Sequence, residues 1–142
     1  KNLSAGALFS IDENWSLATN LTHTERAPTQ NELFSNGAHV ATNQYEIGNK
    51  NLNVEKANGL DAQIRWKREK HSLSVSGFYT RFTNFISIYN TGEDVHGLRE
   101  ANTIGVPAIF TGMEAQGKFR IYEGVGDLNL NLRGDYALGR WF

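Results

Sequence analysis

The side chains best suited to bind a metal ion or a polar ligand fall in two polar stretches. The first is NGAHVATNQYEIGNKNL, residues 36–52, and the second is TGEDVHG, residues 91–97. Imidazole and carboxylate groups are suitable ligands for zinc, which takes three or four such groups in one place. The candidate ligand-binding residues are His39, Asn43, Tyr45, Glu93, Asp94 and His96. Of these, His39 and His96 are the candidate metal ligands.

Two observations weigh against a metal site. Positions 39 and 96 lie 57 residues apart, so the sequence alone does not show that they meet in space. A polar loop also accommodates a solvated histidine with no ligand at all. The other histidines, His23 and His71, are predicted at opposite ends of their strands and do not complete a site.

Other chemistries find less support in the sequence. There is no G-x-S-x-G nucleophile elbow and no glycine loop that would cradle phosphate. The chain has no cysteine, which excludes disulfides, thiolate metal sites and a cysteine nucleophile. Fourteen basic residues against 15 acidic ones give no concentration of positive charge for nucleic acid. We therefore expect neither an enzyme nor a nucleic-acid-binding protein, and no intrinsic cofactor.

The elements that must position these residues are β-strands. Apolar and polar residues alternate with a period of two, which predicts strands with one apolar and one polar face. A slip of phase near Arg81 and Phe82 indicates a β-bulge. The predicted strands cover about residues 3–10, 15–22, 60–67, 71–89, 109–121 and 128–136. The sequence thus predicts an all-β, antiparallel up-and-down meander of about six strands.

The connections between these strands alternate in length. Short turns are expected at residues 12–14, 69–70 and 123–126, and long loops at about 25–56 and 90–106. In a meander, this order places the long loops at one end and the tight turns at the other. Outer-membrane barrels have this asymmetry, and their strands are longer than those of most soluble sheets. A soluble sheet with one face in water remains an alternative on alternation alone.

Aromatic residues favour the membrane interpretation. Trp15 directly follows one tight turn, and Trp66 precedes the next. Tryptophan is enriched where a barrel meets the membrane surface. On the last strand, Arg140 shares the outward parity of Tyr136, so its charge would face lipid and is tolerable only near an interface. We expect the end at Phe142 to be a truncation.

The first long loop is predicted to be ordered. Thr29 and Glu32 fit a capping box for a single helical turn that ends near Gly37. This region is also part of an ordered series of residues. It consists of Glu25-Arg26-Ala27-Pro28, Asn31-Glu32-Leu33-Phe34, Gly37, His39, Ala41-Thr42, Tyr45-Glu46-Ile47-Gly48-Asn49, Leu52 and Glu55, and continues with Phe78-Tyr79, Phe82, Phe85-Ile86 and Gly112-Met113-Glu114.

This series resembles the β-barrel portion of TonB-dependent outer-membrane receptors over nearly the whole chain, and His39 is reminiscent of the zinc- and haem-importing branches. The resemblance implies a fragment of a large barrel of about 22 strands. It implies a location in the outer membrane of a Gram-negative bacterium, in contact with lipid. The plug domain is expected to be absent from residues 1–142.

The same resemblance implies a function. The expected activity is uptake of a scarce nutrient, such as an iron-siderophore, haem or zinc, with energy from the TonB-ExbB-ExbD complex acting through the missing N-terminal region. The loops at 25–56 and 90–106 would be extracellular, and Arg26, Glu32 and Asn49 would order the first of them. The alternative is a soluble β-sheet module for binding or adhesion at the cell surface.

Overall fold

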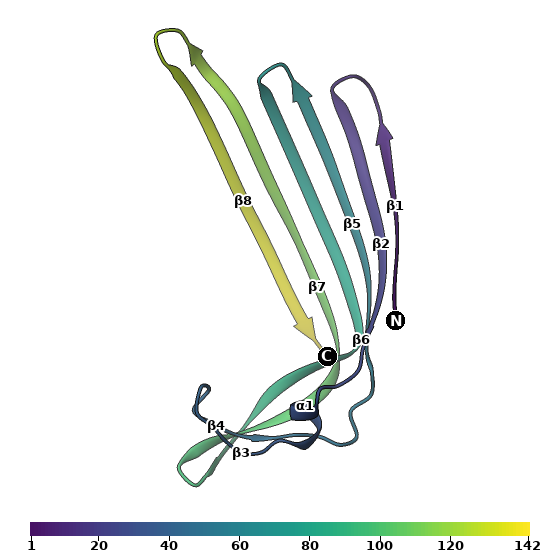
Figure 1. Cartoon of the computed structure of the whole chain (residues 1–142), viewed down its shortest axis with the longest axis vertical. Helices are drawn as coiled ribbons and strands as arrows, with labels where there is room; N and C mark the ends of the chain where they lie inside the picture. Colours follow the sequence, from purple (N-terminus) through teal and green to yellow (C-terminus); the bar gives the residue numbers. More distant parts are fainter.

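Six long antiparallel strands lie side by side and form one curved sheet (Figure 1). The structure is a computed structural model that describes all 142 residues. The long strands are β1 (Asn2–Ser10), β2 (Trp15–Arg26), β5 (Glu55–Arg68), β6 (His71–Val95), β7 (Leu98–Glu123) and β8 (Asp127–Trp141). They follow one another in sequence order across the sheet, which confirms the predicted meander.

The strand register sorts side chains onto two chemically different faces. On one face, which we call the apolar face, Leu21 pairs with Leu60, which pairs with Tyr79. On the other, the polar face, Arg133 forms an ion pair with Glu114 at 2.9 Å. Because the side chains of a strand alternate in direction, a slip of one residue would exchange the two faces. The register is therefore fixed by the alternation in the sequence.

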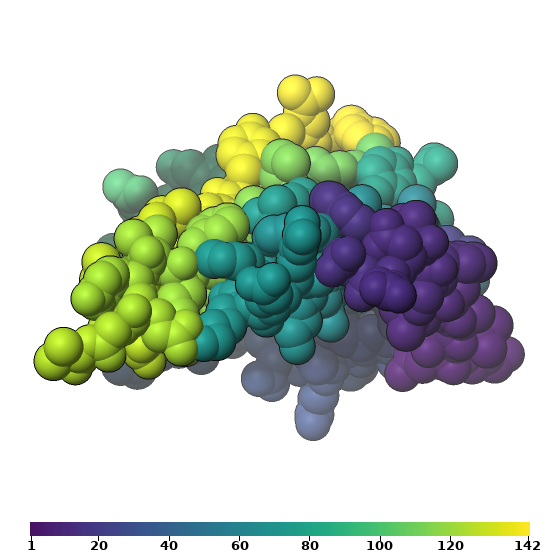
Figure 2. Space-filling view, turned by 90° about the horizontal axis from the view of Figure 1, so that it is seen from above, coloured from purple at the N-terminus to yellow at the C-terminus, as the bar shows by residue number.

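The sheet is a single layer without a core of its own. Only seven of the 142 residues are buried, and large apolar side chains of the apolar face, such as Leu60 and Met113, are exposed in this chain. Seen from the end that carries the turns, β1 and β2 lie at one side, the β7–β8 turn lies at the other, and the β5–β6 turn lies between them (Figure 2). No helix in the structure is long and apolar enough to cross a membrane.

Three tight turns lie together at one end of the sheet, the turn end (Figure 1). In the first, Oδ1 of Asp12 accepts hydrogen bonds from the backbone amides of Asn14 and Trp15 at 2.7 and 2.8 Å. Trp15 lies beside Trp66 of the neighbouring strand, with 6.4 Å between ring centroids. The predicted short turns are therefore confirmed, and both tryptophans lie beside them as expected.

The connection between β2 and β5, residues 27–54, lies at the opposite end, which we call the loop end. It contains a helix, α1 (Gln30–Phe34), and two short strands, β3 (Asn36–His39) and β4 (Gln44–Ile47). Thr29 and Glu32 form the predicted capping box. The two short strands were not predicted, because four residues are too few for alternation to distinguish a strand from a loop.

The prediction of a long loop at 90–106 was wrong. β6 continues to Val95 and β7 begins at Leu98, so this segment is the outer part of one long hairpin. Its turn consists of His96 and Gly97, both with positive φ, at 54° and 80°. Two-residue turns with positive φ at both positions match the twist of a hairpin and usually carry Asn-Gly or Asp-Gly. The sequence did not indicate this turn, because a histidine stands in the first position where asparagine or aspartate is usual.

A bulge bends the β6–β7 hairpin at the loop end (Figure 1). Phe82 pairs with Ala108 and Phe85 pairs with Val106, so two residues of β6 stand opposite Pro107 alone. Proline has no amide hydrogen to donate, and it is tolerated inside a sheet where the ladder is interrupted. The predicted bulge near Arg81 and Phe82 is thus confirmed, and the hairpin beyond it turns away from the long sheet.

Candidate functional site

The two polar stretches that carry the candidate residues are joined by strand pairing. β4 pairs in parallel with the outer part of β7, from Gln44 opposite Arg99 to Ile47 opposite Asn102. This edge of β7 is available because β8 ends at Trp141, opposite Ala108. The first connection therefore reaches across the β6–β7 hairpin and extends its sheet by β4 and β3. We call this assembly of β3, β4 and the outer hairpin the rim sheet.

Side chains from both stretches meet on the rim sheet. The rings of Tyr45 and His96 lie 6.0 Å apart between centroids, and the Tyr45 hydroxyl donates to Oδ1 of Asn36 at 3.1 Å. The side-chain amide of Gln44 donates to Oδ1 of Asn90 at 2.9 Å. The structure therefore brings together two candidates, Tyr45 and His96, that lie 51 positions apart in sequence.

His39 lies at the end of β3 in a small polar cluster. Its Nδ1 atom is 3.0 Å from Oγ1 of Thr42 and 3.4 Å from Oε1 of Glu46, and the Thr42 hydroxyl lies 3.1 Å from the same carboxylate oxygen. The His39 side chain is half exposed. Asn43, in the turn between β3 and β4, has a positive φ of 53°. A backbone of this kind suits asparagine, which gives Asn43 a structural reason to be there.

The remaining candidates lie along the tip of the hairpin. Glu93 lies in a second irregular segment of β6, between Asn90 and Asp94, and Asp94 pairs with Arg99. His96 occupies the turn itself. No group of three or more histidine, aspartate and glutamate side chains gathers where it could hold a metal ion. A metal bound at His39 or His96 would therefore need further ligands from outside this chain.

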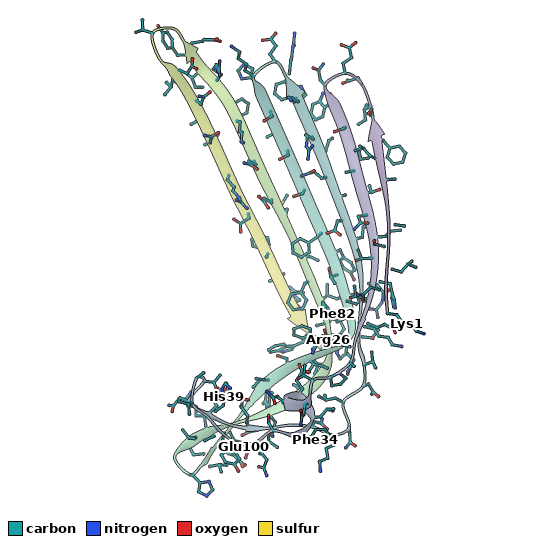
Figure 3. The ribbon with its side chains drawn as sticks, viewed as in Figure 1. Lys1, Arg26, Phe34, His39, Phe82 and Glu100 are labelled. Carbon is teal, nitrogen blue, oxygen red and sulfur yellow. The ribbon has the colours of Figure 1, made fainter.

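An arginine joins the loop to the sheet at the base of the first connection. Arg26, the last residue of β2, donates from Nε and Nη2 to the two carboxylate oxygens of Glu55 at 3.1 Å each. Its Nη1 donates to both oxygens of Glu32 in α1, at 2.9 and 3.1 Å. Glu55 also accepts from the backbone amide of Ile86 at 2.9 Å. We call Arg26, Glu32 and Glu55 the loop clamp. Its arginine, Arg26, lies where the long sheet meets the rim sheet (Figure 3).

The clamp keeps the Glu32 carboxyl ionised. Partial burial acts to raise its pKa, but hydrogen bonds from Arg26 and from the Thr29 backbone and hydroxyl lower it further, so the net pKa lies below the ordinary value of 4.5. A carboxyl whose pKa is lower in the folded state stabilises the fold above its unfolded pKa. That contribution is lost as the pH falls through the lowered pKa.

We therefore expect acid to release α1 before it unfolds the long sheet. In the full-length protein, hydrogen exchange at the amides of residues 30–35 should stay slow from neutral pH down to about 4.5 and accelerate below that, after correction for the intrinsic rate. In Glu32→Gln, exchange should already be fast at neutral pH and should change little with acid. Equal protection of wild-type α1 at pH 3 and pH 7 would contradict this account.

The returning half of the connection packs directly against α1. The Gly48 amide donates to the carbonyl of Ser35 at 2.7 Å, and the Asn49 amide donates to the carbonyl of Glu32 at 2.8 Å. A Cβ atom on Gly48 would stand 2.7 Å from backbone atoms of Leu33, Phe34 and Ser35. Only glycine permits this approach. The interpretation of Arg26, Glu32 and Asn49 as residues that order the loop agrees with these contacts.

An open hollow of about 420 Å³ separates α1 from the rim sheet. It is lined by Asn31, Glu32, Ser35, Glu46, Ile86, Ser87, Ile88 and Thr103. Its two carboxylates are already engaged, Glu32 by Arg26 and Glu46 by Thr42. Glu46 and Gln44 belong to the polar network of the rim sheet although the sequence analysis did not select them. The feature of the sequence that could have identified them is their position on either side of Tyr45, since all three residues lie on β4.

A single layer of long strands, with one apolar and one polar face, with only short turns at one end and with a long connection and an extended hairpin at the other, defines a segment of a membrane-spanning β-barrel. The family model described as TonB dependent receptor-like, beta-barrel, matches residues 2–141. The chain belongs to this family of TonB-dependent receptors, which are transport receptors of the Gram-negative outer membrane. Because the chain belongs to this family, the alternative interpretation as a soluble β-sheet module for binding or adhesion is replaced.

Solved structures share the fold. The siderophore receptor PirA from Pseudomonas aeruginosa matches with a TM-score of 0.77 and 18% identity, over 99% of this chain and 28% of its own. The copper transporter OprC matches with a TM-score of 0.78 and 19% identity, over 96% and 20%. A G324V mutant of the ferric enterobactin receptor PfeA from Pseudomonas aeruginosa matches with a TM-score of 0.69 and 15% identity, over 96% and 22%. This chain thus spans about a quarter of such a barrel protein.

Proposed function

We propose that this chain forms part of the wall and the outer rim of a receptor that imports a scarce nutrient across the outer membrane with energy from TonB, ExbB and ExbD. The coupling would run through an N-terminal region outside these residues, and a plug would fill the barrel against the polar face. The loop end would face the cell exterior. The observation that carries the proposal is the rim sheet, which joins two distant polar segments at the end opposite the tight turns.

The ligand would contact the rim sheet through His39, Asn43, Tyr45, Glu93, Asp94 and His96. Their amide, phenol, imidazole and carboxylate groups suit a polar or metal-bearing cargo, such as an iron-siderophore, haem or zinc. The names of the solved relatives, a siderophore receptor and a copper transporter, support this class of cargo. For zinc, His39 and His96 would each supply one ligand and the rest of the barrel would supply the others.

The test replaces each histidine without disturbing its backbone. Asparagine tolerates positive φ, so His96→Asn keeps the hairpin turn and removes the imidazole. His39→Gln keeps a polar side chain at the end of β3. We expect each substitution to weaken zinc binding to the full-length receptor at least tenfold if zinc is the cargo. A matched control is His71→Gln at the turn end, which should bind zinc as the wild type does. Unchanged affinity in both rim variants would remove His39 and His96 from the site.

A further inference from the structure

Two arginines stand on the apolar face at the loop end without a partner. The last apolar row across the sheet consists of Leu21, Leu60, Tyr79, Thr111 and Leu138. The next row on the same face consists of His23, Asn58, Arg81, Ile109 and Arg140. Arg81 and Arg140 thus replace apolar residues where the apolar band ends.

The polar groups on the other half of this row are paired within the chain, which sets the two arginines apart. In this row Nδ1 of His23 lies 2.8 Å from Oδ1 of Asn58, and in the next row toward the loop end Nζ of Lys56 lies 3.9 Å from Oε1 of Glu25. Arg81 and Arg140 are exposed and take part in none of the ion pairs of the chain. Within this chain, the positive charge on this side of the row is therefore uncompensated.

The spacing of the two arginines suits a common anionic partner. They lie on β6 and β8 with Ile109 of β7 between them, so their backbones are separated by about 10 Å, twice the distance between neighbouring strands. Arginine side chains are long enough to converge on one headgroup across that distance. A guanidinium group binds phosphate oxygens through two parallel hydrogen bonds, which an ammonium group does not.

We propose that Arg81 and Arg140 bind the phosphate groups of the glycolipid in the outer leaflet, whose acyl chains lie along the apolar face below them. The assignment rests on the proposed function, because the loop end must face the cell exterior for this row to meet that leaflet. A charge on the lipid face is costly at the middle of the bilayer and costs little at its surface. A phosphorylated headgroup supplies the counter-charge that this chain lacks there.

The experiment titrates the full-length receptor, purified in a neutral detergent, with bisphosphorylated lipid A and counts bound lipid by native mass spectrometry. We expect the double variant R81Q/R140Q to bind about tenfold more weakly than the wild type. The double variant R81K/R140K, which keeps the charges without the planar fork, should fall between the two. R68Q is the matched control, because Arg68 is an exposed arginine on the same face at the turn end, and it should bind as the wild type does.

Further measurements show whether the two arginines recognise the phosphate groups of the lipid, the rest of the lipid or free phosphate. Lipid A without its phosphates should bind the wild type as weakly as intact lipid A binds R81Q/R140Q, and inorganic phosphate at equal concentration should not displace the intact lipid. Folding of each variant is checked by heat-modifiable migration on gels. If the double variant does not fold, the single variants R81Q and R140Q are titrated in its place. Lipid binding by R81Q/R140Q within twofold of wild type, or an equal loss in R68Q, would overturn the proposal. Nutrient uptake by the folded double variant is scored separately, so loss of the lipid site and loss of receptor function are distinguishable.

Discussion

Replacing Arg26 with alanine should release the first connection from the barrel wall. Arg26 makes four hydrogen bonds to the carboxylates of Glu32 and Glu55, and the Glu55 side chain is only 13% exposed. Without the guanidinium, two carboxylates would face each other with no counter-charge. A hydrogen bond to a charged group contributes about 1.5–3 kcal/mol, and leaving a buried charge unpaired costs more than the bond itself. We expect docking of the loop to weaken by about 2 kcal/mol, the lower part of this range, because Arg26 is 43% exposed.

Limited proteolysis of the full-length receptor measures this release. Residues 27–54 should be cut roughly 30-fold faster in Arg26→Ala, because 2 kcal/mol corresponds to about that ratio of open to closed loop. Arg26→Lys should be intermediate, since lysine keeps the charge but not the fork that reaches both carboxylates. Arg65→Ala, on the polar face of the next strand, should leave the loop unchanged because Arg65 bonds only to the Gln63 side chain. Equal cutting of Arg26→Ala and wild type would contradict a clamping role.

Gly48→Ala is expected to have the second large effect. A Cβ atom there would lie 2.7 Å from three backbone atoms of α1 and its C-terminal end, which cannot move away as a flexible side chain does. Overpacking of this kind costs about 1–3 kcal/mol. The two hydrogen bonds that join the returning segment to α1 would lengthen or break, and β4 would lose its fixed position beside β7.

Hydrogen exchange of the full-length receptor would show this loss. Protection of the β4 amides, Gln44 to Ile47, should fall in Gly48→Ala, while the strands of the wall keep theirs. Gly37→Ala is the matched control, because a Cβ atom on Gly37 in the same connection meets nothing within 4 Å. If Gly37→Ala loosens β4 as much as Gly48→Ala does, the close packing of Gly48 against α1 is not what holds the rim sheet.

The wall of the barrel could be predicted from the sequence because its physics is local. Alternation with a period of two shows both that a strand exists and which face is apolar, as the register from Leu21 through Leu60 to Tyr79 confirms. The capping box of α1 also depends on neighbours only three residues apart. The bulge was visible as a slip of phase. Each of these features depends on residues that lie close together in the sequence.

The rim sheet could not be predicted, because it depends on contacts between distant segments. β3 and β4 exist only through pairing with each other and with β7, and nothing in four residues encodes a partner about 55 positions away. The outer hairpin was missed because polar residues such as Asn90 and Glu93 interrupt the alternation and His96 stands where a turn usually has asparagine. The candidate residues were selected for their chemistry, and only the pairing of β4 with β7 explains why they lie on one surface.

We propose that the loop end carries a ligand-facing rim outside the cell and that the turn end lies in the periplasm. Labelling of intact cells with a membrane-impermeant maleimide tests it most directly, with single cysteines at Asn43 on the rim and at Val125 in the β7–β8 turn of an otherwise cysteine-free receptor. We expect that Asn43→Cys is labelled in intact cells and that Val125→Cys is labelled only after the outer membrane is permeabilised. Labelling of Val125→Cys, and not Asn43→Cys, in intact cells would contradict it.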